Sequence, residues 1–360
     1  MYTYTHGGDI YAFESKKILD FSANTNPLGL PDSVKKAMAE AIESSDIYPD
    51  PFCRELRAAI SLMEGIPNEN IFCSNGAADI LWRLAAGLKP KTALLPVPSF
   101  SEYEEALNSV GCEIEYFYMR EAEEFRLTEK FIERLSPDVQ VTILCNPNNP
   151  TGHTIPKELL GEILAVCGKN GTIVVMDECF MDFLPDAENL TTKAGIERYK
   201  NLIVLKAFTK LYAMAGVRLG YSFCGNKNTL KRLYGGGQPW PVSTIAQRAG
   251  AAAAGDKKYV ADSLDMIGRE RKRLQKTLTD IGCKVYDSQA NYLFFRASGE
   301  IAGKNIDLKE ALIENDILIR SCENYRGLSK GYYRIAVKTP EENDILIECL
   351  DKKYGKRRHQ

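Results

Sequence analysis

Histidine and paired cysteines are scarce in this 360-residue sequence, and this scarcity argues against a metal centre. The three histidines are His6, His153 and His359, and the ten cysteines include no Cys-x-x-Cys pair. Zinc sites in proteins are built from clustered cysteine and histidine side chains. We therefore expect no metal site, and we expect the cysteines to serve as small apolar residues in a reducing compartment.

The sequence also lacks a strong net charge and any long apolar run. Its 46 Lys and Arg residues nearly balance 48 Asp and Glu residues, for a formal net charge of −2. No broad basic surface for nucleic acid is therefore expected. No apolar run reaches membrane-spanning length, and Met1–Phe13 has no basic region followed by an apolar one. We expect a cytoplasmic protein with no nucleic-acid or membrane partner.

Short apolar segments alternate with amphipathic segments over the first two-thirds of the chain. Buried parallel strands read as continuous apolar runs, and helices connect them. The alternation therefore predicts an α/β fold with a mostly parallel central sheet. The expected strands are Thr92–Pro96, Glu113–Tyr118, Val139–Cys145, Thr172–Met176, Leu202–Lys206 and Leu219–Phe223, and the expected helices include Asp32–Ser45, Ser101–Val110, Thr128–Leu135 and Pro156–Gly168.

The pattern changes after Trp240. Two long helical segments precede several strands without regular crossover helices, which is typical of a smaller α+β domain. We predict a large domain of residues 33–242, and a small domain of residues 243–360 together with residues 1–32, which have no sheet register of their own. The expected elements of this part are the helices Thr244–Gly255 and Tyr259–Ile281, the strands Lys284–Asp287, Ala290–Arg296, Ile317–Arg320 and Tyr333–Val337, and a final helix from near Glu341.

Three polar loops follow predicted strands of the large sheet. They carry Asn149 in Asn-Pro-Asn-Asn-Pro-Thr-Gly, then Asp177, then Lys210 and Arg218. Ligands of open α/β sheets bind beyond the carboxyl ends of the strands, so we expect these side chains to surround one cleft. An amide, a carboxylate, an amine and a guanidinium in one cleft match the needs of pyridoxal 5'-phosphate (PLP).

Each side chain suits one part of PLP. The amine of Lys210 can form an imine if burial and nearby cations lower its pKa. The carboxylate of Asp177 can keep the pyridine nitrogen protonated. The amide of Asn149 can donate to the ring oxygen without adding charge.

The phosphate of PLP requires backbone N–H groups at the start of a helix, which Gly76-Ala77-Ala78 can supply, with a bidentate contact from Arg218. Each feature alone has a plainer explanation: a turn-rich loop, a helix cap, a surface lysine or close packing. Their joint occurrence in this order favours a PLP enzyme.

Over its whole length the sequence resembles the fold-type-I PLP-dependent aminotransferase superfamily (class I and II). Within that superfamily it is most similar to the L-threonine-O-3-phosphate decarboxylases and is related to the histidinol-phosphate aminotransferases. The similarity to the decarboxylases is carried by His6-Gly7-Gly8, Asp20–Gly29, Tyr48–Pro51, Phe100–Glu104, Gln238–Trp240 and Ala290–Tyr292.

The resemblance implies a role for each matching residue. The catalytic residues would be Lys210, which carries PLP as a Schiff base, Asp177 at the pyridine nitrogen and Asn149 at the ring oxygen. The other cofactor-binding residues would be Gly76, Ala77, Ala78, Phe100, Thr209 and Arg218, with Tyr48 supplied by the neighbouring subunit of a homodimer whose active site lies at the interface. The substrate-binding residues would be His6, Asn24, Arg320 and Arg334.

The sequence departs from many members of the superfamily at two positions. Phe180 stands where they have a tyrosine, as it does in the decarboxylases, and Ala207 replaces a residue with a hydroxyl group. The second change removes one phosphate contact, worth about 1–2 kcal/mol.

The resemblance implies decarboxylation of L-threonine O-3-phosphate to (R)-1-amino-2-propanol phosphate, in cobalamin biosynthesis. Arg320 and Arg334 suit a small substrate that bears both a phosphate and a carboxylate. The sequence leaves open which arginine takes which group, and an ion pair of Arg320 with Glu323 is a structural alternative. A histidinol-phosphate-type aminotransferase with the same PLP site also stays open. A non-catalytic PLP-fold binding protein is a further alternative, although the retained catalytic residues argue against it.

Overall fold

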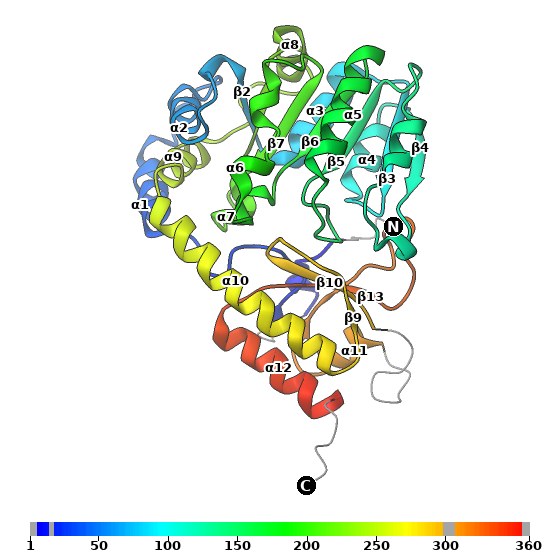
Figure 1. Ribbon diagram of the computed structural model, residues 1–360. Helices are drawn as coiled ribbons and strands as arrows, with labels where there is room; N and C mark the ends of the chain where they lie inside the picture. The colour runs from blue at the N-terminus through cyan, green and yellow to red at the C-terminus, as the bar shows by residue number, and fades with distance from the viewer. Residues whose placement is uncertain (1–5, 14–17, 298–306, 355–360) are drawn as a thin grey trace.

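The computed structural model describes residues 6–13, 18–297 and 307–354. Figure 1 shows two parts: a large sheet covered by helices, and a smaller part below it that contains the C-terminal strands. The long helix α10 (Lys257–Asp280) runs from one part to the other. Within the described ranges, no helix combines the length and apolar character that crossing a bilayer requires.

A seven-stranded sheet with the order β2-β8-β7-β6-β5-β3-β4 forms the centre of the large part. The pairs from β7 through β4 are parallel, whereas β8 runs antiparallel to both β2 and β7. The predicted α/β class with a mostly parallel sheet is therefore confirmed. The strands are β2 (Ile71–Ser74), β3 (Thr92–Val97), β4 (Glu113–Tyr118), β5 (Val141–Cys145), β6 (Ile173–Asp177), β7 (Leu202–Ala207) and β8 (Gly220–Cys224).

Helices cover both faces of this sheet because its inner strands are apolar and buried on both sides. One face packs against α3 (Ala77–Leu88), α4 (Glu102–Asn108) and α8 (Lys227–Gly235). The other packs against α5 (Lys157–Asn170). The expected helix at 128–135 is a 3₁₀ helix, Glu129–Arg134. The remaining helices of this part are α1 (Asp32–Ala41), α2 (Arg54–Glu64), α6 (Ala187–Leu190) and α7 (Phe208–Leu211).

The smaller part contains a four-stranded antiparallel sheet with the order β12-β13-β10-β9. A separate parallel pair joins the N-terminal strand β1 (Leu19–Asp20) to β11 (Ile317–Leu318), so the expected strand 317–320 is split between two sheets. The other elements are β9 (Lys284–Val285), β10 (Tyr292–Arg296), β12 (Arg320–Ser321), β13 (Tyr332–Ala336), α11 (Leu308–Ile313) and α12 (Pro340–Tyr354), whereas α9 (Thr244–Ala253) lies beside α1 and α2 of the large part.

The N-terminal residues thus pair with a strand of the C-terminal part, as a shared small domain requires. However, α9 lies after the predicted boundary at 242/243 and packs against α1, which lies before it. The predicted division of the chain stays a prediction.

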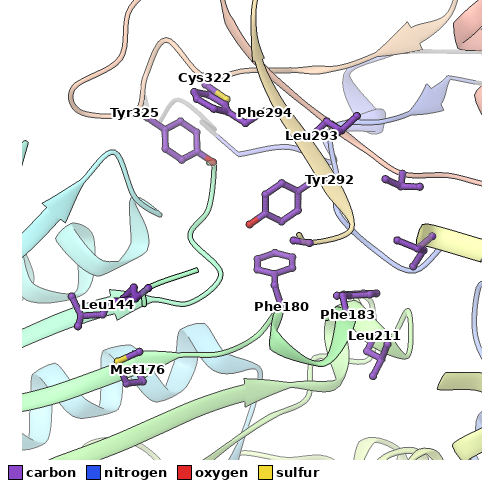
Figure 2. Close-up of a cluster of buried hydrophobic side chains, with 14 of the residues drawn as sticks. Leu144, Met176, Phe180, Phe183, Leu211, Tyr292, Leu293, Phe294, Cys322 and Tyr325 are labelled. Atoms are coloured by element: carbon purple, nitrogen blue, oxygen red, sulfur yellow. The ribbon is translucent and has the colours of Figure 1, made fainter. Parts of the chain in front are cut away.

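Apolar side chains join the two parts where the strands of the large sheet end. Figure 2 shows Phe180, which follows β6, facing Tyr292 of β10. Their ring centroids lie 5.0 Å apart in an edge-to-face arrangement, a favourable geometry for aromatic pairs. This contact holds β10 against the carboxyl ends of the parallel strands.

Candidate active site

A cavity of about 550 Å³ lies at the carboxyl ends of the strands of the large sheet. Its lining combines residues from the loops after β3, β5, β6 and β7 with residues of the small part. The structure brings together nearly all of the predicted site residues in this one place: His6, Asn24, Ala77, Ala78, Phe100, Asn149, Asp177, Thr209, Lys210, Arg218, Arg320 and Arg334.

Lys210 lies in α7, the short helix that directly follows β7. Burial, followed by the nearby charge of Arg334, lowers the pKa of its amine to about 8. Both effects disfavour the ammonium form. A substantial fraction of the amine is therefore unprotonated near neutral pH, as a nucleophilic lysine requires.

Asp177 is the last residue of β6, and both of its oxygens accept hydrogen bonds. Oδ1 accepts from the backbone N–H of Cys179 at 3.0 Å, and Oδ2 accepts from the hydroxyl of Tyr103 at 2.6 Å. Tyr103 is fully buried, and burial together with the charge of Asp177 raises the pKa of its hydroxyl well above the ordinary value. The hydroxyl therefore stays protonated and fixes the carboxylate. Sequence reasoning missed Tyr103, although it marked the segment Phe100–Glu104.

Asn149 is oriented by two donors from the small part. Nη1 of Arg334 donates to its Oδ1 at 2.6 Å, and the hydroxyl of Tyr325 donates to the same oxygen at 3.3 Å. Because the carbonyl end of the amide is engaged, its NH₂ group is the end available to a ligand oxygen.

Two polar groups of the cavity are buried without a hydrogen-bond partner in the described part of the chain. They are the side-chain amide of Asn24, which is 1% exposed, and Nε of Arg334. Buried polar groups are nearly always satisfied, so both groups indicate a site for a polar ligand. Nη2 of Arg334 donates to the backbone carbonyl of Ser22 at 2.7 Å, which fixes the guanidinium against the N-terminal segment.

Gly76 and Arg218 form a cradle at the start of α3. Gly76 has φ +88°, and a Cβ placed on it would lie 2.9 Å from Nη2 of Arg218. A Cβ on Gly220 would lie 2.4 Å from the backbone nitrogen of Ala77. The positive φ of Gly76 and the backbone contact at Gly220 favour glycine at both positions, and the resulting close approach brings the helix start and the guanidinium together as an anion site.

His6 and Arg320 line the side of the cavity formed by the small part. Nε2 of His6 lies 2.9 Å from Oε1 of Glu102. Arg320 donates to Oδ1 of Asn324 at 2.7 Å, and its guanidinium lies 5.3 Å from the ring centre of Tyr325. Within the described ranges Arg320 forms no ion pair with a carboxylate, so the alternative pairing with Glu323 is not formed.

Tyr48 lies outside the cavity. It is 79% exposed and stacks on Trp240, with ring centroids 4.6 Å apart. Its predicted role requires a second subunit and stays a prediction.

The donor set fits PLP. The cavity holds an amine with a lowered pKa, a fixed carboxylate, an amide that presents its NH₂ group, an aromatic ring at Phe100 and a cradle for a phosphate. Each of these groups meets one of the cofactor's chemical needs.

Comparisons with known proteins point in the same direction. The profile of the family "Aminotransferase class I and II" matches residues 16–350. A threonine-phosphate decarboxylase of Salmonella typhimurium is 34% identical over 357 residues, covering 97% of this chain and 96% of that protein. A histidinol-phosphate aminotransferase of Methanosarcina mazei is 33% identical over 346 residues, covering 95% and 89%. The crystal structure of the histidinol-phosphate aminotransferase from Clostridium acetobutylicum matches with a TM-score of 0.84 at 30% identity, covering 93% of this chain and 98% of that one.

Proposed function

The chain belongs to the aminotransferase class I and II family of PLP-dependent enzymes, and from that premise we propose that it decarboxylates L-threonine O-3-phosphate to (R)-1-amino-2-propanol phosphate, a step of cobalamin biosynthesis. The proposed substrate and reaction rest on the cationic and hydrogen-bond-donating groups that line the cavity. Arg320, Arg334 and His6 line it together. Two arginines suit one small substrate that bears both a phosphate and a carboxylate.

PLP supplies an electron sink that weakens whichever bond at the α-carbon stands perpendicular to its ring. Lys210 would hold the cofactor covalently and would return a proton to the α-carbon of the substrate. A pKa of about 8 suits both tasks, because the amine can exist in either protonation state near neutral pH. Asp177, fixed by Tyr103 and by the backbone of Cys179, would stabilise positive charge at the pyridine nitrogen.

The choice of the bond that breaks depends on how the substrate is held. Loss of CO₂ requires the carboxylate, rather than the α-hydrogen, to stand out of the ring plane. We assign the carboxylate to Arg334 and Asn24, whose buried groups are unpartnered within the described ranges. We assign the phosphate to Arg320 and His6. Anchoring both ends of a small molecule leaves few orientations at the reacting carbon.

A homodimer completes the proposed site. Tyr48 is exposed and lies outside the cavity of its own chain, so it is available to a partner. We assign it to the cofactor phosphate of the neighbouring subunit.

A histidinol-phosphate-type aminotransferase is the second candidate. It is favoured by the 33% identity to the Methanosarcina mazei protein and by the structural match at a TM-score of 0.84. Such an enzyme would use the same cofactor residues. Phe180, at a position where many aminotransferases carry a tyrosine, favours the decarboxylase.

The test is product analysis with L-threonine O-3-phosphate as substrate. We expect CO₂ and aminopropanol phosphate in equal amounts, with the cofactor remaining in its aldehyde form. A keto acid together with pyridoxamine phosphate would support the aminotransferase instead. Parallel reactions with serine phosphate, which lacks the methyl group, and with histidinol phosphate, which lacks the carboxylate, measure how strongly the enzyme selects for each of these groups. Hydrophobic pockets discriminate a methyl group by about 1–3 kcal/mol.

A further inference from the structure

The helix that carries Lys210 is short, and its end is capped by a distant part of the chain. α7 spans only four residues, Phe208–Leu211. The carbonyl groups at the end of a helix have no partner within the helix, so they need donors from elsewhere. Asn26 supplies two of these donors. Its backbone N–H donates to the carbonyl of Lys210 at 2.9 Å, and its side-chain Nδ2 donates to the carbonyl of Leu211 at 2.7 Å.

The side chain of Asn26 is itself fixed, because both of its polar atoms are engaged. It is 2% exposed. Nδ2 also donates to Oγ of Ser263 in α10 at 2.6 Å, and Oδ1 accepts from the backbone N–H of Leu28 at 3.1 Å. A buried amide whose two ends are both satisfied has one preferred orientation. Asn26 therefore gives the end of α7 a rigid support on α10.

The segment that contains Asn26 also joins Lys210 to the substrate side of the cavity. Four residues before Asn26, the backbone carbonyl of Ser22 accepts from Nη2 of Arg334 at 2.7 Å. Between these two residues, Asn24 lines the cavity. The segment therefore runs from the arginine of the small part to the lysine of the large part, and Asn26 is its contact with the lysine.

We infer that Asn26 is a positioning residue for Lys210: its contacts with the end of α7 hold the amine in its buried place at the wall of the cavity. Asn26 is not part of the cavity lining, so it acts through the backbone of α7. The inference rests on the role proposed for Lys210 as the residue that binds PLP. It applies to a decarboxylase and to an aminotransferase alike.

The surroundings of the amine indicate what a shift of α7 would change. Burial is the largest cause of the lowered pKa of Lys210, which is about 8. Arg334 of β13 and Arg218, which precedes β8, lower this pKa further. Cys179 and Asp177, near the end of β6, act to raise it. If α7 loses its support, the amine gains access to water, and its pKa should rise towards the ordinary value of 10.5.

The test is the rate at which apo-protein incorporates PLP, measured by stopped-flow absorbance at pH 7 and pH 9.5. In Asn26→Ala the carbonyl of Leu211 loses its side-chain donor. We expect the pKa of Lys210 to rise by about one unit, so incorporation should slow about tenfold at pH 7 and by less than about twofold at pH 9.5. A loss of the same size at both pH values would overturn the inference, because that pattern indicates general damage to the fold.

Asn343→Ala provides the matched control. Asn343 is fully buried in α12, away from the cavity lining, and its amide makes the same three kinds of contact as that of Asn26. Nδ2 donates to the carbonyl of Lys338 at 2.8 Å and to Oε2 of Glu270 at 2.9 Å, and Oδ1 accepts from the backbone N–H of Lys338 at 3.2 Å. We expect both variants to lower the urea midpoint to a similar extent. Only Asn26→Ala should change the incorporation rate of the folded protein, and an equal change in Asn343→Ala would overturn the inference.

Asn26→Leu keeps the inference testable if the alanine variant does not fold. Leucine fills the space of the amide without offering a donor, so that a cavity does not add to the effect. We expect the same pattern, about tenfold slower incorporation at pH 7 and less than about twofold at pH 9.5. A wild-type rate at pH 7 in folded Asn26→Leu would overturn the inference.

The outcomes also separate this inference from the proposed function. Incorporation of PLP requires no substrate, so the result does not depend on which reaction the enzyme catalyses. If Lys210→Ala still forms the visible absorbance of lysine-bound PLP, the role of Lys210 fails and the inference fails with it. If that absorbance is lost as expected, but Asn26→Ala behaves like Asn343→Ala at both pH values, only the inference about Asn26 fails.

Discussion

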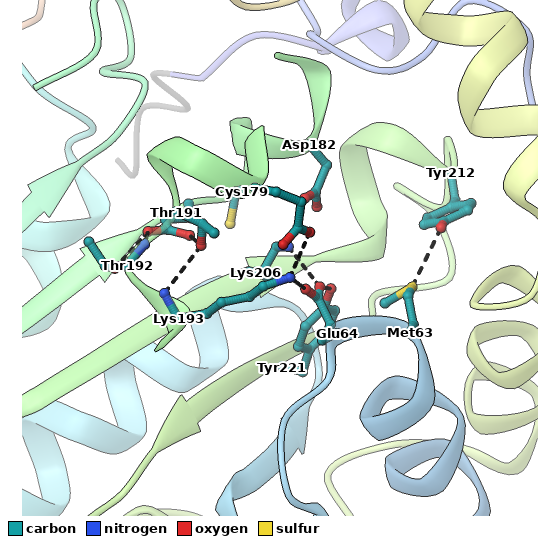
Figure 3. Close-up of polar contacts among 12 residues, drawn as sticks. Met63, Glu64, Cys179, Asp182, Thr191, Thr192, Lys193, Lys206, Tyr212 and Tyr221 are labelled. Atoms are coloured by element: carbon teal, nitrogen blue, oxygen red, sulfur yellow. Dashed lines mark hydrogen bonds and ion pairs between the residues drawn. The ribbon is translucent and has the colours of Figure 1, made fainter. Parts of the chain in front are cut away.

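Two lysines lie close together in the sequence, one in β7 and one in α7, and their amines have opposite chemistry. Lys206, within the strand, is 2% exposed, and its Nζ lies 2.7 Å from an oxygen of Glu64 and 2.7 Å from one of Asp182. Figure 3 shows this ion cluster, which also includes Lys193 and Tyr221. Lys210, in the short helix α7 that follows β7, faces the active-site cavity with Arg334 and Arg218 nearby.

The difference lies in the charges around each amine. At both lysines burial acts to lower the pKa, because it disfavours the charged ammonium form. At Lys206 the charges of Asp182 and Glu64 outweigh burial and raise the pKa above its ordinary value, whereas at Lys210 the charge of Arg334 adds to burial. Burial alone therefore does not make a lysine reactive. The ion cluster holds a permanent cation that links β7 to Glu64 of α2 and to Asp182, and the cavity holds an amine that can lose its proton.

The largest effect is expected when each lysine is removed. Lys210→Ala should lower kcat/KM by about 10³-fold or more, because the amine that holds the cofactor and transfers the proton is lost. It should also abolish the visible absorbance of lysine-bound PLP. Lys206→Met should retain both the absorbance and the activity of the folded fraction. Steady-state decarboxylation assays and absorbance spectra measure this contrast. Loss of the absorbance in folded Lys206→Met would contradict the predicted difference between the two lysines.

The ion cluster should show its effect in stability. Glu64→Gln keeps the shape of the side chain but leaves Lys206 and Lys193 with one fewer carboxylate each, so we expect the free energy of unfolding to fall by about 3–5 kcal/mol. Burial raises the pKa of Glu64, but Lys206 and Lys193 outweigh it and lower the value from 4.5 to about 2. The stability that Glu64 contributes is therefore present above pH 4.5 and is lost as the pH falls towards 2.

Urea unfolding of the wild type and of Glu64→Gln at several pH values measures this dependence. The difference between the two proteins should shrink below pH 4.5, the ordinary pKa of glutamate. A difference that stays constant down to pH 3 would contradict the assignment, as would unchanged stability at neutral pH. Arg248, which pairs with Glu55 on the surface, provides the control: Arg248→Gln should cost less than about 1 kcal/mol.

Much of the fold could be predicted because its signal is local. The expected strand 113–118 matches β4, and the expected helix 156–168 lies within one or two residues of α5 (Lys157–Asn170). The antiparallel direction of β8 could not be predicted, since an apolar run carries no information about direction. The helix α2 was missed although Leu56 and Ile60 are spaced for one apolar face.

The candidate site could be located from the sequence only in part. The residues that the loops after β5, β6 and β7 supply follow from the rule that ligands bind at strand ends. The contact of Tyr103 with Asp177 and that of Glu102 with His6 join residues far apart in the sequence. No spacing predicts such contacts. For the same reason, nothing in the sequence distinguishes Lys206, with its carboxylate partners, from a surface lysine.

The pH dependence of cofactor binding should sharpen the comparison of the lysines. PLP reacts with the unprotonated amine, and the pKa of Lys210 is about 8. The rate of PLP incorporation into apo-protein should therefore rise about tenfold from pH 7 to pH 9 and then level off. Because the unfolded chain keeps the ordinary pKa of 10.5, the stability of the apo-protein should also rise between about pH 8 and 10.5. Stopped-flow absorbance measures the incorporation rate, and a rate that still rises tenfold per unit above pH 9 would show that the amine is unperturbed.

The smallest effect is expected from removing the hydroxyl of either of two tyrosines, each of which donates a hydrogen bond to an important carboxylate. Tyr221 donates to Glu64 in the ion cluster at 2.7 Å, and Tyr103 donates to Asp177 in the cavity at 2.6 Å. Each Tyr→Phe change removes one buried hydrogen bond to a charged group and should cost about 1.5–3 kcal/mol of stability. Only Tyr103→Phe should also lower kcat, by about fivefold to tenfold, because only Asp177 faces the cofactor. Parallel urea unfolding and kcat measurements on the two variants compare the regions directly. An equal loss of kcat in Tyr221→Phe would mean that the ion cluster, like the cavity, takes part in catalysis.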